Sequence, residues 1–283
     1  MPRGVAVVTD STAYLPADLI ARHGIDIVPL HVAVGGSAGR EGIEVTPVEV
    51  ASALHERRYA VTTSRPAPEE LAAAYRRAFD AGASGVVSVH LSATLSGTFE
   101  AASLAAADAS GPVAVVDSRS TAMGLGFAVL AAAGAAEAGA ELDAVRTAAE
   151  STAARTVTLF YVDTLEHLRR GGRIGAASAL VGTTLAVKPI LHVDGGRIVV
   201  KEKVRTASRG MARLEDLAVE AAGDRGCDLA VHHLAAADRA EGLRDRLVAR
   251  LPGLGRVMVV EVGAVVGAHA GPGLGGVGVV PRA

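Results

Sequence analysis

The segment Gly85-Val-Val-Ser-Val-His-Leu-Ser-Ala-Thr-Leu-Ser-Gly-Thr98 carries the clearest structural signal in the chain. Its first five residues form an apolar run typical of a buried strand, and a hydroxyl-rich turn follows. Ser96 is well placed to cap a helix that begins near Thr98. Because a helix N-terminus offers free N–H groups and a partial positive charge, we expect this turn to bind a small anion.

Strand and helix signals alternate on both sides of this segment. Apolar runs at residues 5–9 and 113–116 read as strands, and helical patterns occupy residues 68–81 and 98–108. This alternation predicts a parallel sheet with helices on both faces. The second half differs, because residues 190–204 read as a β-hairpin around Asp194-Gly-Gly196. The sequence therefore predicts an α/β protein with two domains, a Rossmann-like one over 1–152 and a mixed-sheet one over 153–283.

Composition and charge exclude several classes of protein. The formal net charge of -2 over 283 residues gives no electrostatic footprint for nucleic acid or an anionic membrane. A single cysteine, Cys227, rules out an internal disulfide and fits a reducing cytoplasm. The first ten residues hold too short an apolar run for a signal peptide. We expect residues 257–280, which are apolar but rich in glycine, to form strands and turns rather than a membrane span.

Other hydroxyl-rich stretches accompany the turn after residue 89. Thr62-Thr-Ser-Arg-Pro66 holds three hydroxyls, and Pro66 biases Arg65 to extended geometry, which predicts a rigid loop. Helix capping accounts for one of these hydroxyls, so a binding role is favoured for the rest. In Asp10-Ser-Thr12 and Asp117-Ser118, which follow other predicted strands, capping is the simpler interpretation.

Basic side chains and one histidine complete the set of candidate residues. Arg173, presented after the paired glycines at 171 and 172, could bind a carboxylate or phosphate. Arg205, beside a predicted helix start, is a weaker candidate for the same role. His269 follows an apolar strand and precedes a rigid Gly-Pro turn, from which it could donate a hydrogen bond to an anion or move a proton.

Taken in order, these segments resemble the DegV family. One departure is Arg65, where that family commonly carries glutamine. The matching pieces are Val5–Thr12, Thr63-Ser-Arg-Pro66, Leu95-Ser-Gly-Thr98, Val116-Asp-Ser118, Leu165–Ile174, Val187-Lys-Pro-Ile190, Lys203-Val-Arg-Thr206 and His269-Ala-Gly-Pro-Gly273.

The resemblance implies a protein that binds one long-chain fatty acid such as palmitate, stearate or oleate. A monomer suffices for that role, no cofactor or metal is expected, and the single cysteine fits a cytoplasmic location. The acyl chain would enter an apolar pocket formed by the second domain, with the carboxylate near the domain interface. An ATP-dependent fatty acid kinase would be the partner that phosphorylates the carboxylate, so the chain would not be catalytic alone. Arg173 and Arg205 would serve phosphoryl transfer or docking. The implied carboxylate contacts are Thr63, Ser64, Ser96, Gly97 and His269.

Two alternatives use the same residues differently. A serine hydrolase would take Ser96 as nucleophile, His269 as base, and Asp117 or Asp10 to orient the histidine. A module that binds a small anion or a sugar phosphate would use the same turn without an acyl chain. Ser96 does not lie in a G-x-S-x-G motif, and the sequence contains no phosphate-binding loop of the Walker type, which favours passive binding over catalysis.

Overall fold

The computed structural model describes residues 3–56, 59–175, 177 and 188–282. These residues divide into two compact units. The N-terminal unit comprises residues 1–31 and 64–155, and the C-terminal unit comprises residues 32–63 and 156–283. The predicted division at residue 152 differs from this arrangement, because it assigns residues 32–63 to the first domain. None of the described helices is long and apolar enough to cross a membrane.

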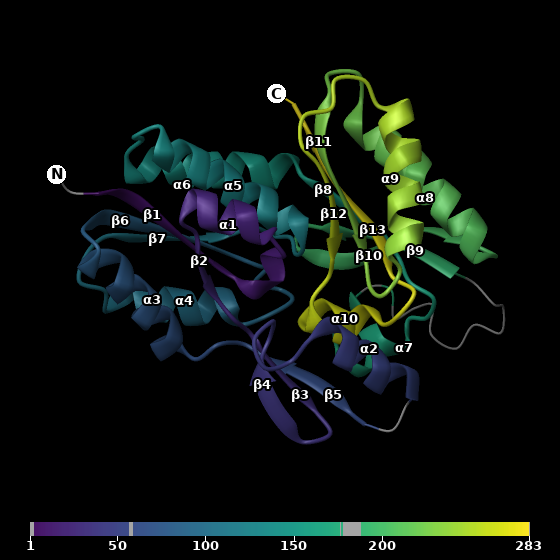
Figure 1. Ribbon diagram of the computed structural model, residues 1–283, viewed down its shortest axis with the longest axis horizontal. Helices are drawn as coiled ribbons and strands as arrows, with labels where there is room; N and C mark the ends of the chain where they lie inside the picture. The colour runs from purple at the N-terminus through teal and green to yellow at the C-terminus, as the bar shows by residue number, and fades with distance from the viewer. Residues whose placement is uncertain (1–2, 57–58, 176, 178–187, 283) are drawn as a thin grey trace. The chain divides into compact units, whose positions relative to one another are not determined.

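The N-terminal unit is built on a four-stranded parallel sheet, in the order β2-β1-β6-β7. Helices α3 and α4 cover one face of this sheet, and α5 and α6 cover the other (Figure 1). The predicted α/β class and its parallel first sheet are thereby confirmed. The elements of this unit are β1 (Arg3–Asp10), η1 (Ser11–Ala13), α1 (Ala17–His23), β2 (Asp26–Val28), α3 (Pro68–Asp80), β6 (Ala83–His90), α4 (Thr98–Ala107), β7 (Val113–Asp117), α5 (Met123–Glu137) and α6 (Leu142–Arg155).

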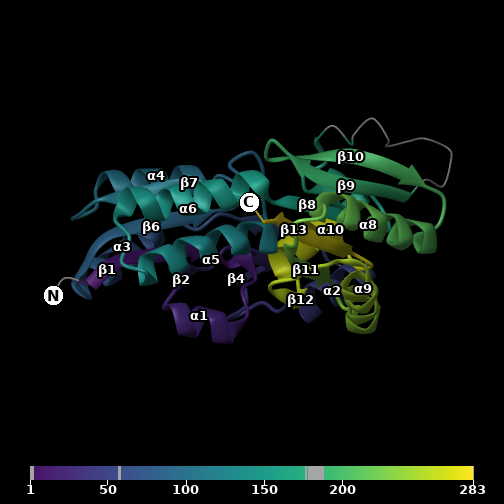
Figure 2. The same cartoon turned by 90° about the horizontal axis from the view of Figure 1, so that it is seen from above.

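The C-terminal unit holds a mixed six-stranded sheet, in the order β10-β9-β8-β13-β11-β12. Strands β9 and β10 form the predicted antiparallel hairpin, seen as two long arrows in Figure 2. Helices α8 and α9 pack against the sheet through a core of aliphatic side chains. The elements are β8 (Val157–Tyr161), α7 (Glu166–Arg170), β9 (Lys188–Asp194), β10 (Arg197–Val204), α8 (Ala207–Ala222), β11 (Cys227–His233), α9 (Ala237–Arg250), β12 (Val257–Glu261), α10 (Ala264–Ala270) and β13 (Gly275–Pro281).

A three-stranded sheet, β4-β3-β5, and helix α2 also belong largely to the C-terminal unit. They comprise β3 (His31–Val34), β4 (Ser37–Arg40), α2 (Pro47–Glu56) and β5 (Val61–Ser64). Helix α2 packs against α10, and the Val265 N–H at the start of α10 donates to the buried Glu41 carboxylate at 2.7 Å. These contacts explain why residues 32–63 group with a segment about two hundred residues further along the chain.

Two local predictions were wrong, both because tertiary contacts override the local sequence. Residues 62–66 were expected to be a rigid loop, but residues 62–64 belong to β5, because strand β3 pairs beside them. The stretch before His269, expected to be a strand, is the helix α10. Glycine-rich sequence is a poor helix former by itself, and Glu41 stabilises the first turn of α10 from outside.

A buried hydrogen-bond chain ties the ends of β1 and β6 together. The Asp10 carboxylate accepts from His90 Nδ1 at 3.0 Å and from the Leu91 N–H at 2.9 Å. His90 Nε2 lies 2.8 Å from the Ser88 hydroxyl, which in turn accepts from the Tyr75 hydroxyl at 3.0 Å. Asp10, Ser88 and His90 are fully buried. The chain therefore fixes the point where β6 ends and the 92–97 turn begins.

We predict that Asp10→Asn lowers the free energy of unfolding by about 1–3 kcal/mol, because an amide N–H₂ then faces backbone N–H donors in a buried site. Urea denaturation measures this change. Asp80→Asn, at an exposed position that ends α3, is the matched control and should leave the midpoint unchanged. Equal midpoints for the two variants would contradict the role assigned to Asp10.

Candidate functional site

The turn between β6 and α4 lies at the carboxyl edge of the parallel sheet, where α/β proteins place their sites. The turns after β1, β6 and β7 lie at this edge, because the three strands are parallel neighbours. The Ser92 N–H donates to the Ser120 carbonyl at 2.8 Å, and the Ala93 N–H donates to the Asp117 carboxylate at 3.2 Å. The Asp117 side chain thus holds the turn in place.

The start of α4 corrects one prediction. Gly97, not Ser96, occupies the N-cap position, and no side chain caps this helix. The Ser96 hydroxyl instead lies 2.8 Å from the Thr98 hydroxyl, within the first turn. With a glycine at the cap, the local sequence supplies no capping side chain. The first backbone N–H groups of the ten-residue helix α4 therefore have no side-chain cap of their own, a property suited to anion binding.

Arg65 brings a positive charge to this helix start. Its Nη1 atom donates to the Gly97 carbonyl at 3.3 Å and lies 3.8 Å from the Glu100 carboxylate. A Cβ atom at Gly97 would lie 2.7 Å from the same nitrogen, so glycine is what allows this close approach. Ser64, just before Arg65, is exposed at the end of β5. Ser96, Gly97 and Arg65 therefore form one group, all within the N-terminal unit.

A second group lies in the C-terminal unit, where Thr63 of β5 meets His269 of α10. The Thr63 hydroxyl and His269 Nε2 lie 2.8 Å apart, although 206 residues separate them in the sequence. The other ring nitrogen, Nδ1, is buried and has no hydrogen-bond partner among the described residues. Two residues that the family resemblance implies as carboxylate contacts are therefore in direct contact with each other.

The burial of Nδ1 indicates which ring nitrogen of His269 carries the hydrogen. A buried N–H without an acceptor is rarer in proteins than an unsatisfied acceptor, so we assign the hydrogen to Nε2. Nε2–H then donates to the Thr63 oxygen. This bond uses the oxygen as acceptor and leaves the Thr63 hydroxyl hydrogen available to donate to an anion.

His269 is neutral at physiological pH. Burial, and after it the positive charge of Arg173, lowers the pKa of His269 to about 4. Arg173 is held nearby, because its side chain donates to the Gly171 carbonyl at 2.6 Å and its N–H to the Leu168 carbonyl at 3.0 Å. The structure thus brings three predicted residues together: Thr63, His269 and Arg173.

Gly171 permits the close packing of the His269 ring. A Cβ atom at position 171 would collide with His269 Nδ1, and the φ angle of Gly171 is an ordinary -75°. The glycine is therefore needed for space and not for backbone freedom. Nothing in the local sequence indicates which side chain lies against Gly171.

Arg205 is not joined to this group by any described contact. It is exposed between β10 and the Thr206 cap of α8, and no ion pair involves it among the described residues. The family motif that begins at Val187 lies partly outside the described residues. Within the part of the chain that the structure describes, no group of three acidic, histidine or cysteine side chains could hold a metal ion.

The geometry does not provide the oriented histidine that a serine hydrolase needs. Asp10 is fully engaged by His90 and neighbouring N–H groups, and Asp117 holds the turns after β6 and β7. His269 contacts a threonine hydroxyl, and among the described residues no carboxylate reaches its Nδ1 atom. A serine, histidine and aspartate do align at Ser88, His90 and Asp10, but all three are fully buried.

Comparison with known proteins identifies what the chain resembles. A family model described as an uncharacterised protein of the DegV family matches residues 4–282. A DegV domain-containing protein of Streptomyces coelicolor is 59% identical over 282 residues and is covered completely, as is this chain. A fatty-acid-binding DegV family protein from Thermus thermophilus is 36% identical, with a TM-score of 0.92 over 98% of this chain and 99% of that one. The fatty acid binding protein DegV from Bacillus subtilis is 33% identical, with a TM-score of 0.89 over 98% and 99%.

We predict that Gly171→Ala displaces the His269 ring and breaks its hydrogen bond to Thr63, at a cost of roughly 1–3 kcal/mol in the free energy of unfolding. NMR of the His269 imidazole and thermal denaturation measure the two effects. The control is Gly134→Ala in α5, where a Cβ atom meets nothing within 4 Å. Gly134→Ala should leave the His269 signals unchanged and stabilise the helix slightly. Unchanged His269 signals in Gly171→Ala would contradict the packing described.

A second prediction concerns pH. With a folded pKa of about 4 against an ordinary 6.5 for His269, the unfolded chain binds the proton first. This residue therefore lowers stability progressively as the pH falls from about 6.5 to 4. Arg173→Gln should raise the pKa of His269, because a nearby positive charge is removed, whereas Arg205→Gln should not change it. Imidazole NMR titration measures both values, and equal titration curves for the two variants would contradict the placement of Arg173.

Proposed function

Because the chain belongs to the DegV family, we propose that it binds a single long-chain fatty acid, such as palmitate, stearate or oleate. Thr63 and His269 of the C-terminal unit contact the carboxylate, and Ser64, Ser96 and Gly97 of the N-terminal unit are further candidate contacts. The main support for this proposal is that two fatty-acid-binding proteins of known structure match this chain over nearly its whole length. The Thr63–His269 pair then supplies a hydrogen-bond donor suited to a carboxylate.

The electrostatics of the Thr63–His269 pair suit reversible binding. His269 is neutral and Thr63 is uncharged, so a carboxylate there is held by hydrogen bonds and not by a buried ion pair. Each hydrogen bond to a charged group contributes about 1.5–3 kcal/mol. Arg173 adds a favourable positive charge near the histidine. The head group is therefore selected and oriented by a few polar contacts.

The acyl chain supplies most of the affinity. At ~0.8 kcal/mol for each buried methylene, a chain of ~16 carbons gains on the order of 10 kcal/mol before the cost of ordering it. We assign the acyl chain to a pocket in the C-terminal unit, whose core is rich in aliphatic side chains. We also propose that the protein works in the cytoplasm as a monomer.

We propose further that the bound carboxylate is the substrate of a separate ATP-dependent fatty acid kinase. A carboxylate oxygen attacks the γ-phosphorus of ATP, the bond to the β-phosphate oxygen breaks, and acyl phosphate and ADP result. The protein itself presents the substrate and is not catalytic alone. Arg173 and Arg205 are the residues assigned to stabilising the transferred group or docking the kinase, since both are cationic and Arg205 is exposed.

Substitution of the carboxylate contacts tests the binding site. Thr63→Val should weaken palmitate binding by about 1–3 kcal/mol, because it removes the donating hydroxyl and keeps the side-chain shape. Thr62→Val is the control, since Thr62 is exposed on the same strand. Ser96→Ala tests the other unit in the same way, with Ser110→Ala as its control. Isothermal titration calorimetry with palmitate measures all four, and acetate as a second ligand separates lipid binding from the binding of any small anion.

The role of His269 is tested by separating binding from phosphorylation. With a purified fatty acid kinase and radiolabelled ATP, His269→Ala should reduce acyl phosphate formation more than it reduces palmitate affinity. The reason is that the neutral imidazole would orient the carboxylate for attack on the γ-phosphorus, a role that affects phosphoryl transfer more than retention of the fatty acid. Equal losses of phosphorylation and affinity would assign His269 to binding alone.

A further inference from the structure

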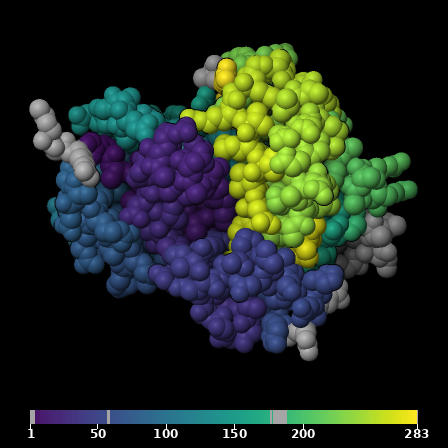
Figure 3. All heavy atoms as spheres, viewed as in Figure 1, coloured from purple at the N-terminus to yellow at the C-terminus, as the bar shows by residue number. Residues whose placement is uncertain are grey.

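Strand β1 has an open edge over its first half. β1 pairs with β6 from Arg3 to Thr9, but β2 joins it on the other side only from Val8 onward. No described strand therefore pairs with the outer side of residues 3–7. In Figure 3 the start of β1, in dark purple, lies at the surface between the blue spheres of α3 and the teal spheres of α5 and α6. An open edge of this kind offers backbone hydrogen-bonding groups to another strand.

The direction of these groups follows from the neighbouring strands. The Val86 N–H donates to the Pro112 carbonyl, so Val86 directs its backbone groups away from β1 and toward β7. In a parallel ladder the direction alternates residue by residue. Ala6, which lies opposite Val86, therefore directs its backbone groups toward β6. Its neighbours Val5 and Val7 direct theirs away from β6. Val5 presents both its N–H and its carbonyl, and Val7 its N–H, to the open side.

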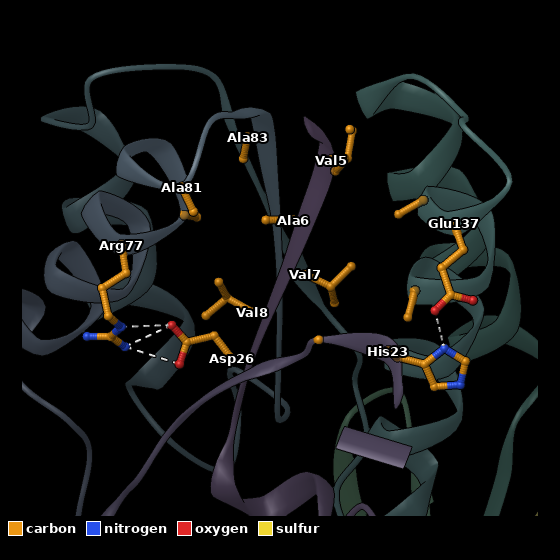
Figure 4. Close-up of a pocket in the computed structure, with 15 residues that line it drawn as sticks. Val5, Ala6, Val7, Val8, His23, Asp26, Arg77, Ala81, Ala83 and Glu137 are labelled. Atoms are coloured by element: carbon orange, nitrogen blue, oxygen red, sulfur yellow. Dashed lines mark hydrogen bonds and ion pairs between the residues drawn. The ribbon is translucent and has the colours of Figure 1, made fainter. Parts of the chain in front are cut away.

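This edge is the floor of a cavity of about 550 Å³, which we call the β1 edge groove. One wall comes from α3 and the start of β6, and the other comes from α5 (Figure 4). The walls carry alanines, which leave room for the side chains of an inserted strand. The alanines are Ala78, Ala81 and Ala83 on the first wall and Ala133 and Ala136 on the second.

The two walls carry charged groups at matching positions. On the first wall, Arg77 pairs with Asp26 at 2.8 Å, and on the second, His23 pairs with Glu137 at 2.7 Å. Figure 4 shows these pairs on opposite sides of β1. The side chains of Arg77 and Glu137 are 59% and 50% exposed, so each can form an additional contact with a charged group of a ligand. The first wall therefore offers a cation and the second an anion.

We propose that the β1 edge groove binds an extended segment of a partner protein, which adds a strand to the sheet at Val5 and Val7. Neighbouring residues of an added strand point to opposite faces. The segment that fits best therefore carries an acidic side chain toward Arg77 and, next to it, a basic one toward Glu137. The walls enclose the edge on both sides, so an extended peptide reaches it more readily than the edge of a second folded copy.

The test uses a phage-displayed library of linear dodecapeptides, selected against the full-length protein, with fluorescence anisotropy of the enriched peptides. We expect peptides with adjacent acidic and basic residues between small apolar ones. Val5→Pro removes the N–H that faces the open side and leaves the hydrogen bonds to β6 in place. Edge strands tolerate such a substitution. Ala81→Trp places a bulky side chain at the exposed end of α3, and Ala107→Trp, at the exposed end of α4, is its control.

Val5→Pro and Ala81→Trp should each weaken peptide binding at least tenfold, and Ala107→Trp should leave it unchanged. Peptides methylated on alternate backbone nitrogens should lose binding for one of the two methylation patterns, because only alternate N–H groups face β1. The proposal is overturned if no peptide is enriched, if enriched peptides bind both variants as they bind the wild type, or if the groove is closed by a dimer in analytical ultracentrifugation. Palmitate binding should be the same in all variants, so this result is independent of the fatty acid proposal.

Discussion

The hydrogen bond between Thr63 and His269 is the contact on which the candidate site depends. It joins β5 to α10, two elements that local sequence does not predict correctly. The Glu41 carboxylate holds the first turn of the same helix, so residues 32–63 anchor α10 at both of its ends. Without these contacts, a seven-residue helix rich in glycine and alanine would have little stability of its own. The position of His269 is therefore a property of the C-terminal unit as a whole.

The chemistry of this pair explains why binding is favoured over catalysis. A general base needs a pKa near the working pH and a group that orients it. The pKa of His269 is lowered to about 4, and no described carboxylate orients the ring. A neutral imidazole that donates to a threonine is instead held in a fixed direction. The threonine keeps its hydroxyl hydrogen available to donate to an anion. Such an arrangement is suited to holding an anion in one orientation.

Local patterns were sufficient for much of the fold. The apolar run at 85–89 predicted β6, which begins two residues earlier, and the turn after it predicted the start of α4 at Thr98. The Asp194-Gly-Gly196 turn predicted the β9–β10 hairpin. The helix α10 and the strand β5 were missed because their stability comes from Glu41 and β3, not from their own sequences. The placement of residues 32–63 and the packing of Gly171 on His269 could not be predicted, since both are contacts between distant segments.

The candidate site, like the fold, could be predicted only in part from the sequence. The order of the motifs, through the resemblance it carries, nominated Thr63, Ser96, Gly97 and His269, and their binding role stays a prediction. The contact between Thr63 and His269 is what the structure adds. Ser96 does not have the capping role expected for it: Gly97 occupies the N-cap position, no side chain caps the helix, and the Ser96 hydroxyl contacts the Thr98 hydroxyl. The buried chain through Asp10 and His90 was not predicted, although the alternation of Ser88 and His90 on one face of β6 is the signal that could have shown it.

Native mass spectrometry of the purified protein, followed by organic extraction and identification of what is released, tests the central claim most directly. The account predicts one fatty acid of about 14 to 18 carbons for each chain, since burial of that many methylenes at ~0.8 kcal/mol each is needed for retention. A protein that carries no lipid, and that also fails to take up added palmitate or oleate, would contradict it.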